Sequence, residues 1–128
     1  MAFFYLILFL TTVLAEGCKK EKGCTNVQAA NFRAEAEEDD GSCMYYLLAW
    51  TAEAHDPIEI YIDSVFQDSL KNHRLDTVVT CLESNNLFKK SLVPGTYVFY
   101  ARMEPFIEWS DTIRLDNNCY KVKLELPR

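Results

Sequence analysis

Oxygen-bearing side chains gather in one short stretch near the N-terminus, and their chemistry is that of a calcium ligand set. Five of the six residues from Glu35 to Asp40 are acidic. Calcium prefers carboxylate, amide and hydroxyl oxygens as ligands. Four residues offer such oxygens: Asn31, Asp39, Asp40 and Ser42. The spacing lacks the alternating pattern of an EF-hand loop, so the stretch predicts either calcium binding or a solvated acidic face.

Turn signals flank this acidic stretch. Thr25 followed by Gln28 has the spacing of a capping box, which predicts one helical turn over residues 27–30. Asp40-Gly41 is typical of a tight turn. We therefore expect the acidic residues to lie in a small module of their own.

The chain has five cysteines, and an odd count in an exported protein requires an account of the unpaired one. The positions of four suggest two disulfides, Cys24 with Cys43 and Cys81 with Cys119, although four cysteines allow three pairings. Disulfides indicate an oxidising compartment. Structural zinc is the rival use of the thiols, but no two cysteines have Cys-x-x-Cys spacing, so zinc is not predicted.

An apolar leader opens the chain. Its run from Met1 to Ala15 is shorter than the ~20 residues that a bilayer-spanning helix needs, and it is typical of a secretory signal. The sequence Leu14-Ala15-Glu16-Gly17-Cys18 resembles a bacterial lipobox, in which the cysteine is acylated and becomes the new N-terminus. The resemblance implies that Cys18 is a lipid-attachment site, which accounts for the fifth cysteine. The alternative is an ordinary cleaved signal that leaves Cys18 as a free thiol.

Residues suited to catalysis are sparse. The two histidines, His55 and His73, lie in polar segments, and no Gly-x-Ser-x-Gly elbow accompanies the serines. Glu104 and Glu108 are a carboxylate pair of the kind that glycosidases use, but the sequence does not determine their separation in space. With four glycines and no cofactor fingerprint, the chain is expected not to be an enzyme.

Composition places the chain among small folded proteins, with 49% hydrophobic residues and a net charge of −6. The acidic balance disfavours nucleic acid as a partner. Removal of residues 1–17 leaves 111 of the 128 residues, which suits one domain and a small appendage. We divide the chain into a signal segment (1–17), a lysine-rich tether (18–23), a disulfide-closed acidic motif (24–45) and a β-sandwich domain (46–128).

Strand patterns dominate the rest of the chain. Ile58, Ile60 and Ile62 alternate with polar or amphipathic residues, which is the period-two pattern of a half-buried strand. Asp63-Ser64 follows as a hairpin turn into a second strand over residues 65–70. Further strands are expected at Tyr45–Thr51, near Val78, near Phe88, at Thr96–Ala101, Trp109–Leu115 and Cys119–Leu126.

The last two strands are expected to form a hairpin around Asp116-Asn117-Asn118. The predicted fold class is all-β: a small antiparallel β-sandwich of about seven strands, preceded by the disulfide-closed motif and the signal segment. Tyr61, Phe66 and Trp109 lie on these strands and are candidate binding residues for a glycan, a peptide or a protein. The alternative for each is burial in the core.

A family resemblance covers about a fifth of the chain. The sequence from Gly23-Cys24-Thr25 to Asp39-Asp40-Gly41-Ser42-Cys43 resembles the Gly-Cys-Thr…Asp-Asp-Gly-Ser-Cys motif of Bacteroidota-type surface lipoproteins. Leu92-Val93-Pro94-Gly95-Thr96-Tyr97 is similar to a turn in the prealbumin-like or immunoglobulin-like sandwiches of such proteins. The resemblance implies a cell-surface or outer-membrane location and a sandwich fold, and it implies no catalytic role.

Two functions are therefore expected for a lipid-anchored, exported protein. The first is a surface binding module of unknown ligand, with the membrane as a partner through its anchor. The second is a structural spacer whose acidic motif is stabilised by calcium. A row of exposed aromatic side chains favours binding, whereas converging carboxylate oxygens favour the spacer.

Overall fold

The computed structural model describes residues 20–75 and 79–127. No helix occurs in these residues, so none is long and apolar enough to cross a membrane. The leader, Cys18 and the strand expected near Val78 lie outside the described residues. The described strands are β1 (Lys22–Gly23), β2 (Glu38–Asp39), β3 (Tyr45–Trp50), β4 (Ile58–Ile62), β5 (Val65–Leu70), β6 (Phe88–Leu92), β7 (Gly95–Met103), β8 (Ile107–Leu115) and β9 (Tyr120–Lys123).

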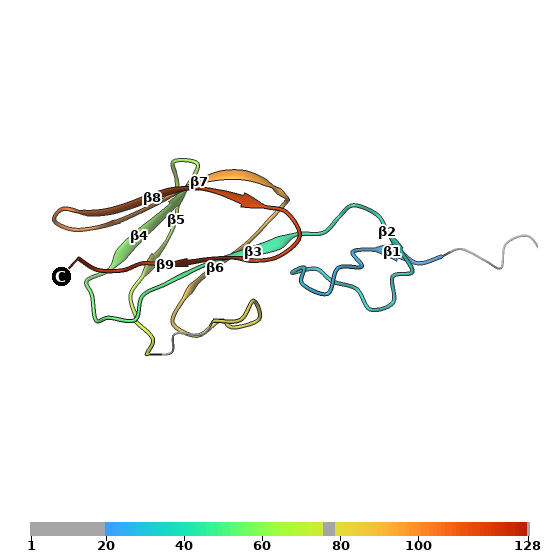
Figure 1. Cartoon of the computed structure of the whole chain (residues 1–128), viewed down its shortest axis with the longest axis horizontal. Coiled ribbons are helices and arrows are strands. Elements are labelled where there is room, and N and C mark those ends of the chain that lie inside the picture. The colour runs from blue at the N-terminus through green and yellow to red at the C-terminus, as the bar shows by residue number, and fades with distance from the viewer. Residues whose placement is uncertain (1–19, 76–78, 128) are drawn as a thin grey trace, which may run out of the picture.

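Strands β3 to β9 form two sheets that pack face to face (Figure 1). The larger sheet has the order β5-β4-β7-β8 and is antiparallel throughout. The smaller sheet has the order β6-β3-β9, in which β3 is antiparallel to β6 but parallel to β9. The predicted all-β sandwich is confirmed, and the β3–β9 pair departs from the purely antiparallel pairing that we expected.

The hairpin expected around Asp116-Asn117-Asn118 is wrong. Strand β8 pairs with β7, with Met103 opposite Ile107, so its hairpin partner precedes it in the chain. The turn at residues 116–118 instead carries the chain to the other sheet, where β9 joins β3. Asp and Asn favour a change of chain direction, but they do not determine which sheet the next strand joins.

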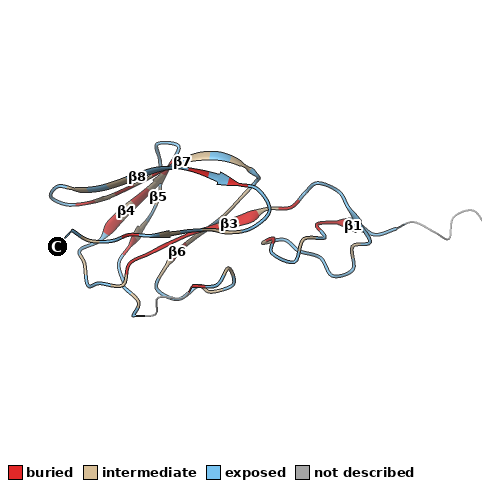
Figure 2. Ribbon diagram, viewed as in Figure 1, coloured by how far each residue is buried: buried red, intermediate tan, exposed pale blue. Residues whose placement is uncertain are grey.

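The core lies between the two sheets and follows the alternation along each strand. Ile58, Ile60 and Ile62 point inward from β4, Phe99 points inward from β7, and Leu47 meets them from β3. Burial of a side chain of this size is worth about 1.5–3 kcal/mol. Figure 2 shows the buried residues concentrated along the strands, with exposed residues in most of the connections.

The hairpin between β4 and β5 forms where it was predicted. Asp63 and Ser64 both have positive φ, 49° and 66°, as a type I′ turn requires. Asp63 also binds the neighbouring strand, because its N–H donates to the Val98 carbonyl at 2.9 Å and its Oδ1 accepts from the Val98 N–H at 2.8 Å. Asp63 thus holds the turn against β7.

The outer face of the three-stranded sheet is covered by the segment of residues 79–87. Leu48 and Trp50 point out of the sandwich from β3 and pack against Val79, with Leu87 and Cys119 beside them. The predicted disulfide Cys81–Cys119 is present and ties this segment to the chain just before β9. One outer face of the sandwich is therefore a second apolar layer.

The N-terminal motif packs against one end of the sandwich and is closed by the predicted disulfide Cys24–Cys43. The helical turn expected over residues 27–30 does not form. Asn26 makes the turn instead, because its Oδ1 accepts from the Gln28 N–H at 2.9 Å. The Asn26 amide also donates to the Tyr45 hydroxyl and to the Asn117 carbonyl, each at 2.9 Å. This one side chain therefore joins the motif to the sandwich.

Each edge of the four-stranded sheet carries an aspartate on its inner side. Asp68 of β5 lies opposite Ile60, and Asp111 of β8 lies opposite Phe99, and both partners are core residues. Both aspartates are exposed. Strand β5 also has a bulge, because its pairing with β4 shifts in register between Ile60 and Tyr61 of β4. Inward charges and bulges oppose pairing with a strand from another molecule, so these edges are poor association sites.

Replacement of both edge aspartates, Asp68→Val with Asp111→Val, is expected to promote self-association because it removes the charges that oppose edge pairing. Sedimentation velocity over a concentration series measures this. Asp56→Val, which changes an exposed aspartate outside the strands, is the control and is expected to sediment like the wild type. If the double variant also sediments like the wild type, the aspartates do not oppose edge pairing.

Candidate functional site

The four candidate calcium ligands lie in the N-terminal motif, Asp39 at the end of β2 and the other three in its turns and connections. Asn31 braces the motif, since its amide donates to the Ser42 carbonyl at 2.7 Å and its Oδ1 accepts from the Met44 N–H at 2.8 Å. Asp39 accepts from the Gly41 N–H at 2.8 Å and from the Thr25 hydroxyl at 3.2 Å. These two side chains therefore hold the backbone around the disulfide.

Asp40 and Ser42 form a second turn. Asp40 Oδ1 accepts from the Ser42 N–H at 3.0 Å and from the Ser42 hydroxyl. Both bonds favour the carboxylate, so they lower the pKa of Asp40 below its ordinary value. In the described part of the chain, no group of three or more His, Cys, Asp or Glu side chains is arranged to hold a metal ion. Calcium binding stays a prediction.

The structure separates Trp109 from the other two candidate binding aromatics. Trp109 lies on the inner side of β8, packs against the core and is half-buried. Its indole N–H donates to the Glu125 carbonyl at 3.1 Å, which fastens the segment after β9 to the edge of the larger sheet. Trp109 therefore has a packing role at the side of the sandwich.

Tyr61 and Phe66 do come together, on the outer face of the four-stranded sheet. Tyr61 lies opposite Phe66 of β5 on one side and opposite Tyr100 of β7 on the other. Both ring pairs have centroids 5.6 Å apart. Phe66 is 54% exposed, and both tyrosines are half-buried. We call these three residues the aromatic row.

A row of charged residues crosses the same face beside the aromatic row. Glu59 lies opposite Arg102, which in turn lies opposite Glu108, and we call these three residues the charged row. The Arg102 guanidinium donates to Glu59 at 2.8 Å and lies 3.6 Å from Glu104. Such partly exposed pairs fix the side chains more than they stabilise the fold.

The two rows are joined by hydrogen bonds. The Tyr61 hydroxyl donates to Glu59 at 2.9 Å, and this bond together with the one from Arg102 lowers the pKa of Glu59. The same bond raises the pKa of Tyr61. Partial burial, and then a hydrogen bond to Glu108, raise the pKa of Tyr100. The Tyr61 hydroxyl is thus held by the Glu59 carboxylate.

Tyr100 and Arg102 belong to this site and were not among the candidates from the sequence. The alternation of β7 marks them, because Val98, Tyr100 and Arg102 occupy every second position while Phe99 and Ala101 are buried between them. Their position opposite Tyr61 and Glu59 depends on the pairing of β7 with β4. Only the register of the sheet brings the rows together.

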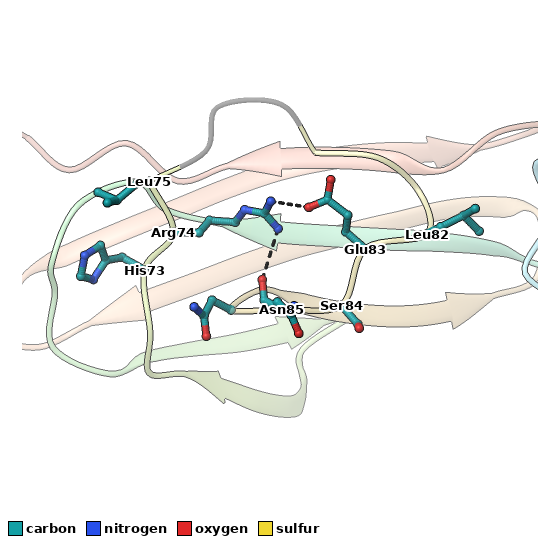
Figure 3. A pocket seen from close by; sticks show the side chains of 8 residues that line it. His73, Arg74, Leu75, Leu82, Glu83, Ser84 and Asn85 are labelled. Carbon is teal, nitrogen blue, oxygen red and sulfur yellow. Dashed lines mark hydrogen bonds and ion pairs between the residues drawn. The ribbon is translucent and has the colours of Figure 1, made fainter.

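A separate surface hollow of about 780 Å³ lies in the loops that follow β5 and precede β6 (Figure 3). Arg74 crosses it, with hydrogen bonds to Glu83 and to the Asn85 carbonyl. The bond from Arg74 lowers the pKa of Glu83. Leu75 and Leu82 are 83% and 82% exposed at opposite ends. The Arg74 bonds join the stretch just after β5 to the stretch just before β6, which gives Arg74 a structural role.

Comparison with known protein families, with curated proteins and with solved structures found no match to this chain.

Replacement of Tyr61 by Phe is expected to raise the pKa of Glu59 toward its ordinary value, because the carboxylate loses a donor. A lowered folded-state pKa stabilises the fold above the unfolded-state pKa, and this contribution is lost as pH falls through the folded-state pKa. The variant should therefore lose less stability over that acidic range.

Carboxyl ¹³C titration by NMR measures this pKa directly. Asp40, whose pKa is lowered by Ser42 in the distant motif, is the internal control and should titrate alike in both proteins. An unchanged titration of Glu59 would show that the Tyr61 hydroxyl has no influence on it.

Proposed function

We propose that this chain is an exported protein, held in the cell envelope by lipid on Cys18, which binds a partner without catalysis through the outer face of its four-stranded sheet. The aromatic row is the observation that carries the binding function. Phe66 is 54% exposed, and the rings of Tyr61 and Tyr100 continue the row across β4 and β7. A contiguous group of aromatic side chains that reach the surface is typical of a binding surface.

The rest of the described sandwich supports this choice of face. Its two inner faces form the core, and the outer face of the three-stranded sheet lies under residues 79–87. Both edges of the larger sheet carry aspartates that oppose strand addition. Among the described faces of the sandwich, the outer face of the four-stranded sheet is the one that no other segment covers.

Export and anchoring are supported by the leader and by the cysteine count. The two disulfides use four of the five cysteines and fit an oxidising compartment outside the cytoplasm. The fifth is Cys18, directly behind the leader. In Figure 1 the N-terminal motif and the C-terminus lie at opposite ends of the long axis, so an anchor before the motif would hold the sandwich away from the lipid.

A panel of immobilised polysaccharides and peptides tests the binding function. At least one member is expected to retain the wild-type protein, and Phe66→Ser is expected to reduce that retention. Val65→Ser is the matched control, since Val65 is an exposed apolar residue on the same strand, 61% exposed, but lies opposite the core residue Ile62. If no member of the panel retains the wild type, or the two variants bind alike, the aromatic row is not the binding surface.

Intact mass of the protein extracted from its native membrane tests the anchor. We expect a species that begins at acylated Cys18 and gains four hydrogens on reduction, two for each disulfide. An unmodified Cys18, or a chain that retains residues 1–17, would contradict lipid attachment. This test is independent of the ligand.

A further inference from the structure

We infer that the outer face of the four-stranded sheet binds a cationic peptide segment, one that presents lysine or arginine side chains. The inference rests on the proposed binding function and adds the chemical class of the ligand. It depends on two features of the face: the tilt of its aromatic rings and its excess of carboxylates over guanidinium groups.

The rings of the aromatic row do not lie in one plane. The Tyr61 and Phe66 rings are inclined by 68°, and the Tyr61 and Tyr100 rings by 54°. Flat stacking of one extended ligand would need nearly coplanar rings. Inclined rings instead offer several faces to a compact positive group, and an ammonium or guanidinium is attracted to such faces within about 6 Å of the ring centroid.

The charges beside the rings are mainly negative. Glu59 and Glu104 lie close to the guanidinium of Arg102, and Glu108 lies opposite it on β8. Arg114, at the other end of the face, is paired with Asp116. Arg102 is already engaged with Glu59 at 2.8 Å and lies 3.6 Å from Glu104. The Glu108 carboxylate helps to raise the pKa of the Tyr100 hydroxyl. The part of the face around the charged row therefore keeps a surplus of negative charge, which attracts cations.

The charge of the whole chain acts in the same direction. With a net charge of −6, the protein repels an anionic ligand and attracts a cationic one during approach. Lysine and arginine side chains combine a charged head with an apolar stem. Such a side chain can pair with a carboxylate of the charged row while its stem lies along the aromatic row.

The test titrates the full chain, with both disulfides formed, with hexa-arginine and follows the ring resonances of Tyr61 and Tyr100 by NMR. Hexaglutamate and maltohexaose serve as the anionic and the neutral probes. We expect hexa-arginine alone to shift both tyrosines, with an affinity that falls as salt rises. Glu108→Gln and Phe66→Ser are each expected to weaken binding about two- to fivefold, the size of one exposed charge or cation–π contact.

Matched variants separate this site from general attraction to an acidic protein. Glu38→Gln removes one exposed charge in the N-terminal motif, outside the sandwich. Val65→Ser removes an apolar side chain from the other side of β5. Neither should weaken binding by as much. If all four variants bind hexa-arginine alike, attraction is nonspecific and the inference is overturned. If maltohexaose shifts the tyrosines and hexa-arginine does not, the ligand class is wrong while the binding face stands. If no probe shifts them, the cationic inference fails, and the panel measurement decides the binding function separately.

Discussion

The disulfide between Cys81 and Cys119 and the segment it holds make the two outer faces of the sandwich different. Strand β3 is apolar on both sides, because Leu47 and Ala49 point into the core while Leu48 and Trp50 point out of it. A strand of this kind is stable only when both of its faces are covered. The described residues 79–87 supply the second cover, and the cross-link keeps them there.

The four-stranded sheet needs no such cover, and this makes it the available face. Its central strands alternate strictly, with Ile60 and Ala101 buried and Tyr61 and Tyr100 between them on the outside. A pair of aromatic rings in contact contributes about 0.5–1.5 kcal/mol beyond its burial. The aromatic row is therefore compatible with a stable sheet while its rings remain accessible to a partner.

The local pattern of the sequence was sufficient for β4, its turn and β5, because the alternation of Ile58, Ile60 and Ile62 ends at a turn that the structure confirms. Pairing between distant segments was not predictable in this way. The parallel contact of β3 with β9 joins Leu47 to Tyr120, and no local pattern marks it. The expected hairpin after β8 failed for the same reason.

In the candidate site, too, side-chain orientation within a strand was predictable from the sequence, whereas pairing between distant strands was not. Trp109 is an even number of residues from the buried Ile113 and Leu115 on β8. Because side chains two residues apart on a strand point to the same face, this spacing places Trp109 on the inner side. Tyr61 and Phe66 were candidates because they are aromatic residues on predicted strands, and the β4–β5 hairpin places them opposite each other. Tyr100 could join them only through the β4–β7 register. The acidic residues were recognised by composition, whereas their turn-forming bonds depend on the folded backbone.

Oxidative footprinting of the tyrosines in the intact envelope and after purification tests the central claim, that a partner occupies the outer face of the four-stranded sheet. Tyr46, which is half-buried on the smaller sheet with Lys89 4.1 Å from its ring centroid, is the internal reference. The account predicts that Tyr61 and Tyr100 are protected in the envelope and become labelled after purification, while Tyr46 is labelled equally in both. Equal labelling of Tyr61 and Tyr100 in the two states would contradict it.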